Sequence, residues 1–322
     1  MRPDDRHYSL VAELIRSGLV IPFFGAGANL TDRPEEAAWG RGTFTPSGGE
    51  LAQTLAQRSR YPDSADLELA RVSQYVDAIL GEGRLYDFLH TVFDANYPPT
   101  SLHRLFARVP ALLREQQEAS GGQLLILTTN YDDLAERALT DAGERYDTVW
   151  YEAKQDAPAR GRFLHRTPDG DVFEVAPANK YDRLAPDERP VILKLHGAID
   201  RLDAKRDSYV ITEDSYIDYL SGGVGEQIPF ALRERMADSH FLFLGYSMRD
   251  WNLRVSLNRI GGAEQLYSRS WAIQREPADP GVREVEQALW RARGDIDLLY
   301  VPLKEYAAGL QAELFSSGGQ TR

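Results

Sequence analysis

The sequence predicts an α/β fold built on a doubly wound, mainly parallel sheet. Short apolar runs typical of strands buried on both faces alternate with segments of helical periodicity, as in parallel sheets covered by helices. Several of these runs end abruptly in glycine or small polar residues. A chain of 322 residues that is 43% hydrophobic and 27% charged can also bury a large core.

Composition and charge exclude several classes of protein. Because the chain has no cysteine, it can form no disulfide, thiolate nucleophile or cysteine-ligated zinc site. Its net charge of −12, without a basic patch, argues against direct binding of nucleic acid. No apolar run approaches the roughly 20 residues that span a bilayer, and the N-terminus lacks an apolar signal core. We therefore expect a cytoplasmic protein that does not associate with membranes.

The first strand is expected at residues 19–24, after a short helix at 9–16. It leads into the turn Gly25-Ala26-Gly27-Ala28-Asn29, where backbone amides can approach a phosphate without interference from side chains. Residues 30–49 are rich in Gly, Pro, Thr and charge, so we predict a loop that covers a substrate. Helical periodicity, interrupted by Pro and Gly, then predicts a helical insertion over residues 50–118.

The central strand is expected at residues 124–127, where four apolar residues follow a pair of glycines. It ends in Thr128-Thr129-Asn130-Tyr131-Asp132, and a helix begins after Asp132 or Asp133, either of which can cap it. Polar residues beyond the carboxyl end of a strand lie where open α/β sheets bind ligands. The alternative is an ordinary turn in which Asn130 only caps the helix.

The remaining elements alternate in the same way. Residues 148–151 predict a strand, and residues 153–190 predict an excursion from the main sheet that contains a hairpin at 163–173. An extended segment at 208–212 leads into a helix that Thr212 caps. The other expected strands are 191–195, 240–244, 271–274 and 298–301, and the other expected helices are 213–220, 225–237, 280–293 and 304–315.

Four of these strands end in unusual turns: Gly25-Ala26-Gly27, Thr129-Asn130-Tyr131-Asp132, His196-Gly197 and Gly245-Tyr246-Ser247. In a parallel sheet all four ends point to one edge, so the sequence predicts a nucleotide site there. A lone glycine turn or a lone His is a weak signal, and the combination carries the prediction.

The four turns, in this order, resemble those of the sirtuin family, and more closely its branch in bacterial antiviral defence. The resemblance covers residues 10–275 and implies a Rossmann-like fold that binds NAD. It assigns the pyrophosphate loop to Gly25, Ala26, Gly27 and Asn29. It places Thr129, Asn130 and Asp132 at the nicotinamide ribose and carboxamide. It makes His196 catalytic with Asn130, and it puts Gly245, Ser247 and Asp250 at the adenosine end.

Two departures from the sirtuin deacylases refine what the resemblance implies. Residues 198–244 lack the four zinc-binding cysteines, and Leu30-Thr31-Asp32-Arg33-Pro34 replaces the Pro-Asp-Phe-Arg run of the deacylases. Without a zinc module, water becomes the expected acceptor in place of an acylated lysine. The resemblance thus implies one catalytic domain over residues 1–322 that hydrolyses NAD to nicotinamide and ADP-ribose, a cyclised product remaining open.

The expected chemistry matches these residue types. The nicotinamide leaving group already carries positive charge, so its departure needs no acid. Asn130 can hold a ribose hydroxyl or a water, and His196, with a pKa near neutrality, can take a proton. Asp132 can accept from the carboxamide, while Ser247 and Asp250 can bind ribose hydroxyls. No metal is expected. The alternatives are a structural role for His196 and helix capping by Asp250.

An NAD hydrolase without control is toxic, so we expect assembly to gate the activity. The partner is a second copy, or a separate sensor or regulatory protein such as an ATPase, a nucleotide-processing enzyme or an Argonaute-type protein. Residues 30–49 or 153–190 are the candidates for these contacts. Two other functions remain open: a protein deacylase or ADP-ribosyltransferase, and a non-catalytic nucleotide-binding module.

Overall fold

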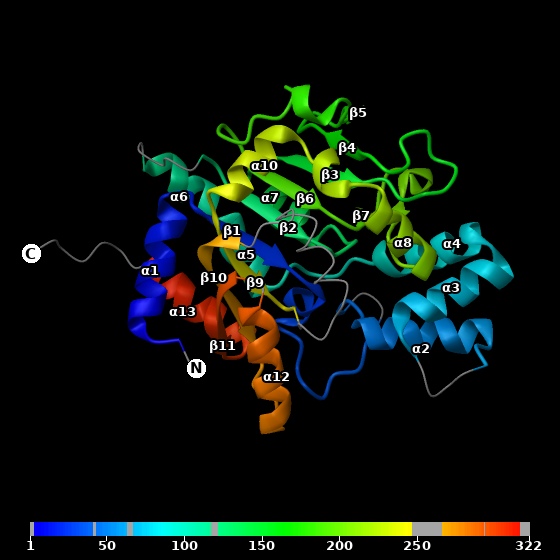
Figure 1. Ribbon diagram of the computed structural model, residues 1–322, viewed down its shortest axis with the longest axis horizontal. Helices are drawn as coiled ribbons and strands as arrows, with labels where there is room; N and C mark the ends of the chain where they lie inside the picture. Colours follow the sequence, from blue (N-terminus) through cyan, green and yellow to red (C-terminus); the bar gives the residue numbers. More distant parts are fainter. Residues whose placement is uncertain are drawn as a thin grey trace, which may run out of the picture.

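One sheet of nine strands organises the part of the chain that the computed structural model describes, residues 3–40, 43–62, 67–116, 122–246, 266–292 and 294–315 (Figure 1). Its order is β11 (Gly294–Tyr300), β10 (Leu266–Gln274), β9 (His240–Leu244), β1 (Val20–Phe24), β2 (Leu125–Thr128), β6 (Val191–Lys194), β3 (Asp147–Tyr151), β4 (Phe163–Arg166) and β5 (Val172–Glu174). The first seven are parallel, and the last two are antiparallel. The mainly parallel sheet is therefore confirmed.

Helices cover both faces of this sheet. Phe23 and Phe24 are neighbours on β1, yet they belong to different hydrophobic cores because side chains alternate along a strand. The core around Phe24 includes α1 (Asp5–Arg16), α5 (Ser101–Ala107), α6 (Val109–Glu115), α7 (Leu134–Asp141) and α13 (Leu303–Phe315). The core around Phe23 includes α8 (Glu213–Ser221), α10 (Phe230–Ala237) and α12 (Pro280–Arg291), with the short α9 (Val224–Gln227) before α10. The fold is doubly wound, as predicted.

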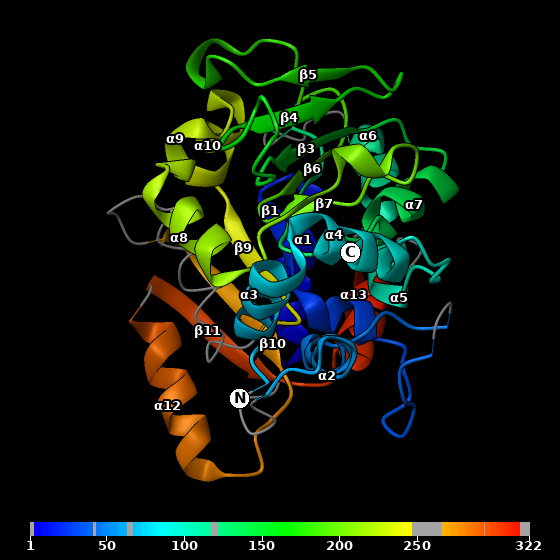
Figure 2. The same ribbon diagram turned by 90° about the vertical axis from the view of Figure 1, so that its right-hand side faces the viewer.

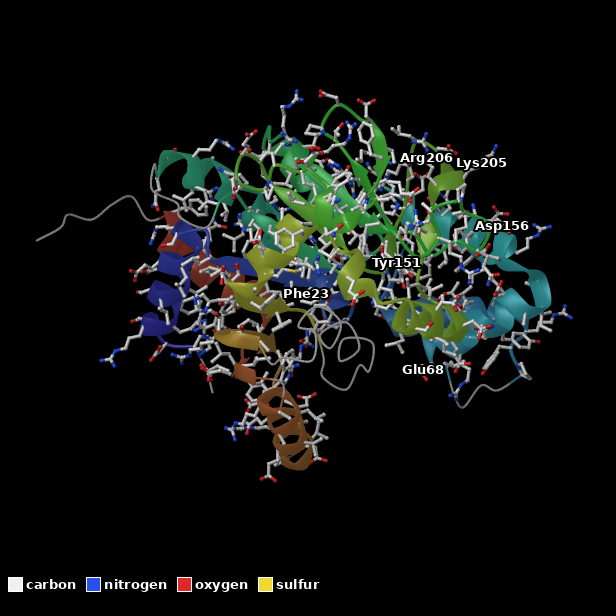
Figure 3. The ribbon with its side chains drawn as sticks, turned by 45° about the horizontal axis from the view of Figure 1, so that its top comes forward. Phe23, Glu68, Tyr151, Asp156, Lys205 and Arg206 are labelled. Atoms are coloured by element: carbon white, nitrogen blue, oxygen red, sulfur yellow. The ribbon has the colours of Figure 1, made fainter. Side chains whose placement is uncertain are left out.

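The predicted helical insertion divides into two parts. The helices α2 (Gly48–Ser59), α3 (Leu69–Leu80) and α4 (Glu82–Phe93) form a separate group, here named the helical lobe, with its own core (Figure 2). Figure 3 shows Phe23 within the sheet and Glu68 out at the helical lobe. In contrast, α5 and α6 pack on the sheet itself. The core of the helical lobe also takes up Ile199, Tyr209 and Ile211, which follow the His196-Gly197 turn in sequence.

Several boundaries differ from the prediction. The strands β10 and β11 begin earlier than expected, at Leu266 and Gly294, and the helix expected at 225–237 is divided into α9 and α10. Two helix starts also differ, each for a reason that the structure shows. The first helix begins at Asp5 because the side chain of Asp4 accepts a hydrogen bond from the His7 amide at 2.9 Å, which caps it. In the same way, Ser47 and Glu50 form a capping box that starts α2 at Gly48, inside the expected loop.

The hairpin predicted at residues 163–173 is present, but its expected separation from the main sheet is wrong. Its strands β4 and β5 extend the sheet beyond β3, with Thr148 opposite Arg166. Because the outer edge of β3 would otherwise leave its backbone groups unpaired, an antiparallel hairpin is a favourable cover. Buried and half-buried residues alternate along β4, as expected for a strand near a sheet edge.

The strand ends that matter for function lie level with one another. Phe24, the last residue of β1, lies beside Thr128 on β2 and beside Leu244 on β9. Thr128 in turn lies beside Lys194, the last residue of β6. The four turns that follow these strands therefore emerge at one edge. The sequence order also reverses at β1, which has β2 on one side and β9 on the other. Such a switch point is where open α/β sheets bind ligands.

None of the helices in the described residues has the length and apolar character needed to cross a membrane. The small second sheet consists of β7 (Gly197–Ala198) and β8 (Ser208–Tyr209), which pair antiparallel. It starts immediately after His196 and links the carboxyl edge of the main sheet to the helical lobe.

Candidate functional site

The first and last turns touch backbone to backbone. The amide of Gly25 donates to the Leu244 carbonyl at 2.9 Å, and the amide of Gly27 donates to the Gly245 carbonyl at 3.0 Å. A Cβ on Gly25 would lie 2.7 Å from the Gly245 oxygen, and a Cβ on Gly245, where φ is +81°, would lie 2.2 Å from the Ala28 nitrogen. These glycines are thus needed for contact between the turns. The amides of Gly25 and Gly27 already have partners, contrary to their expected role as phosphate donors.

Asn29 joins the first turn to the second. It lies in a short 3₁₀ helix (Ala26–Leu30) and is only 7% exposed. Its Nδ2 donates to Asp132 Oδ2 at 2.5 Å, and its Oδ1 accepts from Asn130 Nδ2 at 3.1 Å. The sequence suggested Asn29 only as a contact to NAD. In the structure it lies between the two polar residues of the central turn and sets their spacing.

Asn130 does not cap the helix that follows it. Its Nδ2 donates to the Gly25 carbonyl at 3.0 Å as well as to Asn29, and its backbone amide donates to Thr128 Oγ1 at 2.9 Å. The start of α7 is instead held by Asp132, whose Oδ1 accepts from the Leu134 amide at 3.1 Å. The helix-cap alternative for Asn130 is therefore wrong. Among the described residues Asn130 Oδ1 has no hydrogen-bond partner, so this acceptor is available to a ligand.

Thr129 and Tyr246 link the second and fourth turns. The Tyr246 hydroxyl donates to the Phe24 carbonyl at 2.8 Å, so it must accept from Thr129 Oγ1 at 2.9 Å. The Tyr246 ring packs edge-on against Phe23, with the ring centres 4.9 Å apart. Tyr246 therefore holds the Thr129 turn next to the end of β1, and it also forms part of a cavity wall.

His196 is almost completely buried, at 2% exposed. Its ring packs edge-on against Tyr219 at 5.2 Å and Tyr216 at 5.5 Å, both on α8. Burial lowers the pKa of His196 to about 3, so the expected pKa near neutrality is wrong. The ring is neutral at physiological pH. The following Gly197 has a φ of +91°, and a Cβ there would lie 2.1 Å from the Ser208 oxygen, so the turn requires glycine.

A cavity of about 340 Å³, here named the Asn130 cavity, brings most of the predicted residues together. Its polar wall consists of Ala26, Asn29, Thr129, Asn130, Asp132, His196 and Gly245. The opposite wall comes from the helical lobe and the loop before it and includes Thr45, Leu51, Leu69 and Phe93. The loop at residues 30–49 contributes to the wall, and its role in covering a substrate stays a prediction.

A second cavity of about 390 Å³, here named the Arg275 cavity, lies across the turn at Gly245 and Tyr246, which line both cavities. Its other walls include Gly27, Arg33, Gln274, Arg275 and Lys304. Two predicted residues, Ser247 and Asp250, lie outside the described residues. Within the described ranges no three His, Asp or Glu side chains cluster in a way that would hold a metal ion.

Sequence reasoning missed the apolar wall and the buried Lys194. Leu51, Leu69 and Phe93 are ordinary apolar positions in a helical pattern, and periodicity does not show which of them faces a cavity. Lys194 had a usable signal, because a charged residue within the apolar run Val191–Leu195 contradicts the pattern of a buried strand.

The chain is similar in sequence to known proteins. A family model described as SIR2-like domain matches residues 124–295. A protein named NAD(+) hydrolase ThsA from Acinetobacter baumannii is 27% identical over 229 residues, which cover 69% of this chain and 38% of that protein. Defense-associated sirtuin 2 from Bacillus subtilis is 24% identical over 271 residues, or 83% of this chain and 22% of that protein.

A second NAD(+) hydrolase ThsA, from Cytobacillus dafuensis, is 24% identical over 235 residues, covering 73% of this chain and 37% of that protein. This chain thus spans well under half the length of each of these relatives. The family match includes three of the four turns, those containing Asn130, His196 and Gly245. The chain therefore belongs to the SIR2-like domain family.

Proposed function

We propose that this chain is an NAD hydrolase that cleaves the bond between nicotinamide and ribose, giving nicotinamide and ADP-ribose. The observation that carries the proposal is the Asn130 cavity, in which Asn130 and His196 line one wall although they come from different strands. The names of two relatives, NAD(+) hydrolase, support the same activity.

The two cavities fit the two halves of a dinucleotide. Volumes of about 340 and 390 Å³ are of the size that small ligands occupy. We assign the nicotinamide riboside to the Asn130 cavity, where Leu51, Leu69 and Phe93 exclude bulk water. The adenosine half is assigned to the Arg275 cavity, and the pyrophosphate to the shared wall at Gly245. Three cationic side chains lie on that side: Arg33, which is paired with Glu50, Arg275, which is paired with Glu35, and Lys304.

Each polar residue then has a definite task. The nicotinamide of bound NAD is positively charged and becomes neutral as it leaves, so the protein needs no acid to protonate it. Asn130 accepts a hydrogen bond from a ribose hydroxyl or from the attacking water through its free Oδ1. Asp132 accepts from the carboxamide, since each of its oxygens accepts one protein hydrogen bond and retains further capacity. His196 is neutral and only weakly basic. Its ring accepts a hydrogen bond from a hydroxyl group and so orients that group.

We propose further that assembly gates this activity and that the protein acts in bacterial defence by depleting NAD. The name Defense-associated sirtuin 2 supports the defence role. We propose that this control comes from a second copy or from a separate sensor protein.

Nicotinamide release from NAD by the purified protein, alone and with the products of neighbouring genes, tests the activity. Asn130→Ala and His196→Ala should each lower kcat by at least about 100-fold. Gln311→Ala, at an exposed position on α13 outside the candidate assembly segments, is the control and should leave kcat unchanged. Unchanged turnover in both active-site variants would overturn the mechanism. Stimulation by an acylated peptide would favour a deacylase, and binding of NAD without turnover would favour a signalling module.

A further inference from the structure

Lys194, the last residue of β6, has a buried ammonium group next to the turn that carries Asn130. Its side chain is 1% exposed, although it lies in a strand whose neighbours Ile192, Leu193 and Leu195 are fully buried apolar residues. The ammonium group donates to the backbone carbonyl of Asp132 and to Glu136 Oε1, the latter at 2.8 Å. Glu136 belongs to α7, the helix that follows the Asn130 turn.

Stability alone does not explain this pair. Removing two charges from water is costly, and a buried ion pair is often no more stable than apolar residues of similar volume. Burial raises the pKa of Glu136, although Lys194 acts in the opposite direction. The site as a whole therefore disfavours the charged form of this carboxyl group. An apolar residue at position 194 would continue the pattern of the strand. The lysine is therefore better explained by what its other contact, the Asp132 carbonyl, controls.

The position of Lys194 connects the two turns on which the proposed chemistry depends. It pairs with Thr128 across β2 and β6, and it precedes His196 by two residues. By binding the Asp132 carbonyl, it ties the strand that leads to His196 to the turn that holds Asn130. The turn has other anchors as well: Asn29 and Gly25 from the first turn, Tyr246 from the fourth, and the Ile199 amide, which donates to the Tyr131 carbonyl at 2.8 Å. Lys194 is the contact that reaches the end of the turn, at Asp132, from the strand that precedes His196.

We propose that Lys194 is a positioning residue that sets the turn at Asn130–Asp132 relative to His196. The expected effect on turnover rests on the proposed function, whereas the expected effect on the position of the turn does not. Lys194 touches no substrate in this scheme. Its loss should change kcat rather than KM, because the turn would lose the geometry that the transition state requires.

A double variant separates positioning from simple charge pairing. Lys194→Met with Glu136→Leu removes both charges and leaves no buried charge without a partner. If Lys194 only pairs with Glu136, this variant retains wild-type kcat. Under our proposal it folds but loses kcat by about 10- to 100-fold, with KM changed little. Glu136→Gln is the matched control, because it keeps the bond from Lys194 to Asp132 and should keep kcat close to the wild-type value.

Hydrogen exchange gives a readout that does not depend on activity. In the double variant the amides of residues 129–134 should exchange faster, while those of β1 and β9 should not change. If the wild type releases no nicotinamide under any condition, the proposed function fails, and the exchange comparison still tests Lys194. Wild-type exchange and kcat in the double variant would overturn the inference. If that variant does not fold, Lys194→Met with Glu136→Gln replaces it, since this pair also removes both charges and the donor to the Asp132 carbonyl, and the same two outcomes apply.

Discussion

The Gly27 amide donates to the Gly245 carbonyl at 3.0 Å, which joins the turn after β1 directly to the turn after β9. These strands are neighbours in the sheet, but more than half of the chain lies between them. The contact separates the Asn130 cavity from the Arg275 cavity, since Gly245 lines both. Any side chain introduced at this contact should therefore affect folding and ligand binding together.

Gly245→Ala should destabilise the protein by more than about 2 kcal/mol, because it adds left-handed backbone strain to a steric clash. The new Cβ would lie 2.2 Å from the Ala28 nitrogen, and backbone atoms cannot move aside as a flexible side chain can. Urea unfolding measures the change. Gly83→Ala, where no atom lies within 4 Å of the new Cβ, is the control and should not destabilise. Equal stability of the two variants would contradict the close approach.

Asn29→Ala should lower both stability and turnover. It removes the hydrogen bonds to Asp132 and Asn130 and leaves a buried carboxylate oxygen without its donor, at a cost of about 1–3 kcal/mol. Since Asn130 would lose one of its two anchors, kcat should fall by about 10- to 100-fold. Thermal unfolding and nicotinamide release measure the two effects. A variant that loses only affinity for NAD would show that Asn29 contacts the ligand and does not organise the turn.

The histidines make stability fall in acid. His196 is neutral in the folded protein down to a pKa of about 3, whereas the unfolded chain binds its proton below about 6.5. The unfolded state therefore holds more protons between these values, and stability should decrease as pH falls through this window, by up to about 1.4 kcal/mol per pH unit for one histidine. Burial lowers the pKa of His103 to about 3 as well, so the two effects add.

Urea unfolding between pH 7 and pH 4 provides the measurement. His196→Gln, which does not titrate, should show a smaller loss of stability over this range than the wild type. His240→Gln alters a half-buried histidine on β9 and serves as the control. If the His196 variant and the wild type lose stability in parallel, His196 is accessible to protons in the folded state.

Glu50 holds the loop that closes the Asn130 cavity. Its carboxylate accepts two hydrogen bonds from Arg33, at 2.5 and 2.7 Å, and others from the Trp39 amide at 3.0 Å and the Ser47 amide at 2.9 Å. The Arg33 guanidinium is the main reason that the pKa of Glu50 is lowered to about 2. Glu50→Gln removes the charge from these bonds. It should raise KM for NAD by about 10-fold and change kcat less, since the loop provides a wall and no reacting group.

Steady-state kinetics of nicotinamide release check this prediction, with Glu284→Gln, an exposed position on α12 outside the loop, as the control. The charge also links the loop to pH. Because the folded pKa of Glu50 lies below the ordinary value of 4.5, its stabilising effect is complete above about 4.5 and is lost as pH falls towards 2. An unchanged KM in the Glu50 variant would mean that the loop does not depend on this carboxylate.

The strand ends were predictable because their signals are local. An apolar run buried on both faces followed by glycine or Asn can be recognised within ten residues. Phe24 and Leu244 end their strands as expected, and β2 continues one residue further than expected, to Thr128. The helical lobe was predicted as helical, but its separation from α5 and α6 was not. That separation depends on contacts with Tyr209 and Ile211, which lie far along the chain.

The chemistry of individual residues was harder to predict. The pKa of His196 depends on its burial against Tyr216 and Tyr219 of α8, about 20 residues further along the chain. The residues next to His196 in sequence do not contain that information. For the same reason Asn29 was assigned to the ligand, although its nearest partner is Asp132. Predicted contacts at Ser247 and Asp250 remain predictions.

The two walls of the Asn130 cavity have a consequence for how such a protein diversifies. The sheet edge supplies the hydrogen-bonding groups, and the helical lobe supplies Leu51, Leu69 and Phe93. Leu51 and Phe93 also belong to the core of the lobe, and the Phe93 ring packs against Tyr131, the neighbour of Asn130, with the ring centres 5.5 Å apart. A change of size at these two positions would therefore alter the lobe core as well as the cavity, whereas the half-buried Leu69 is the wall position at which the shape of the cavity can change with the least repacking.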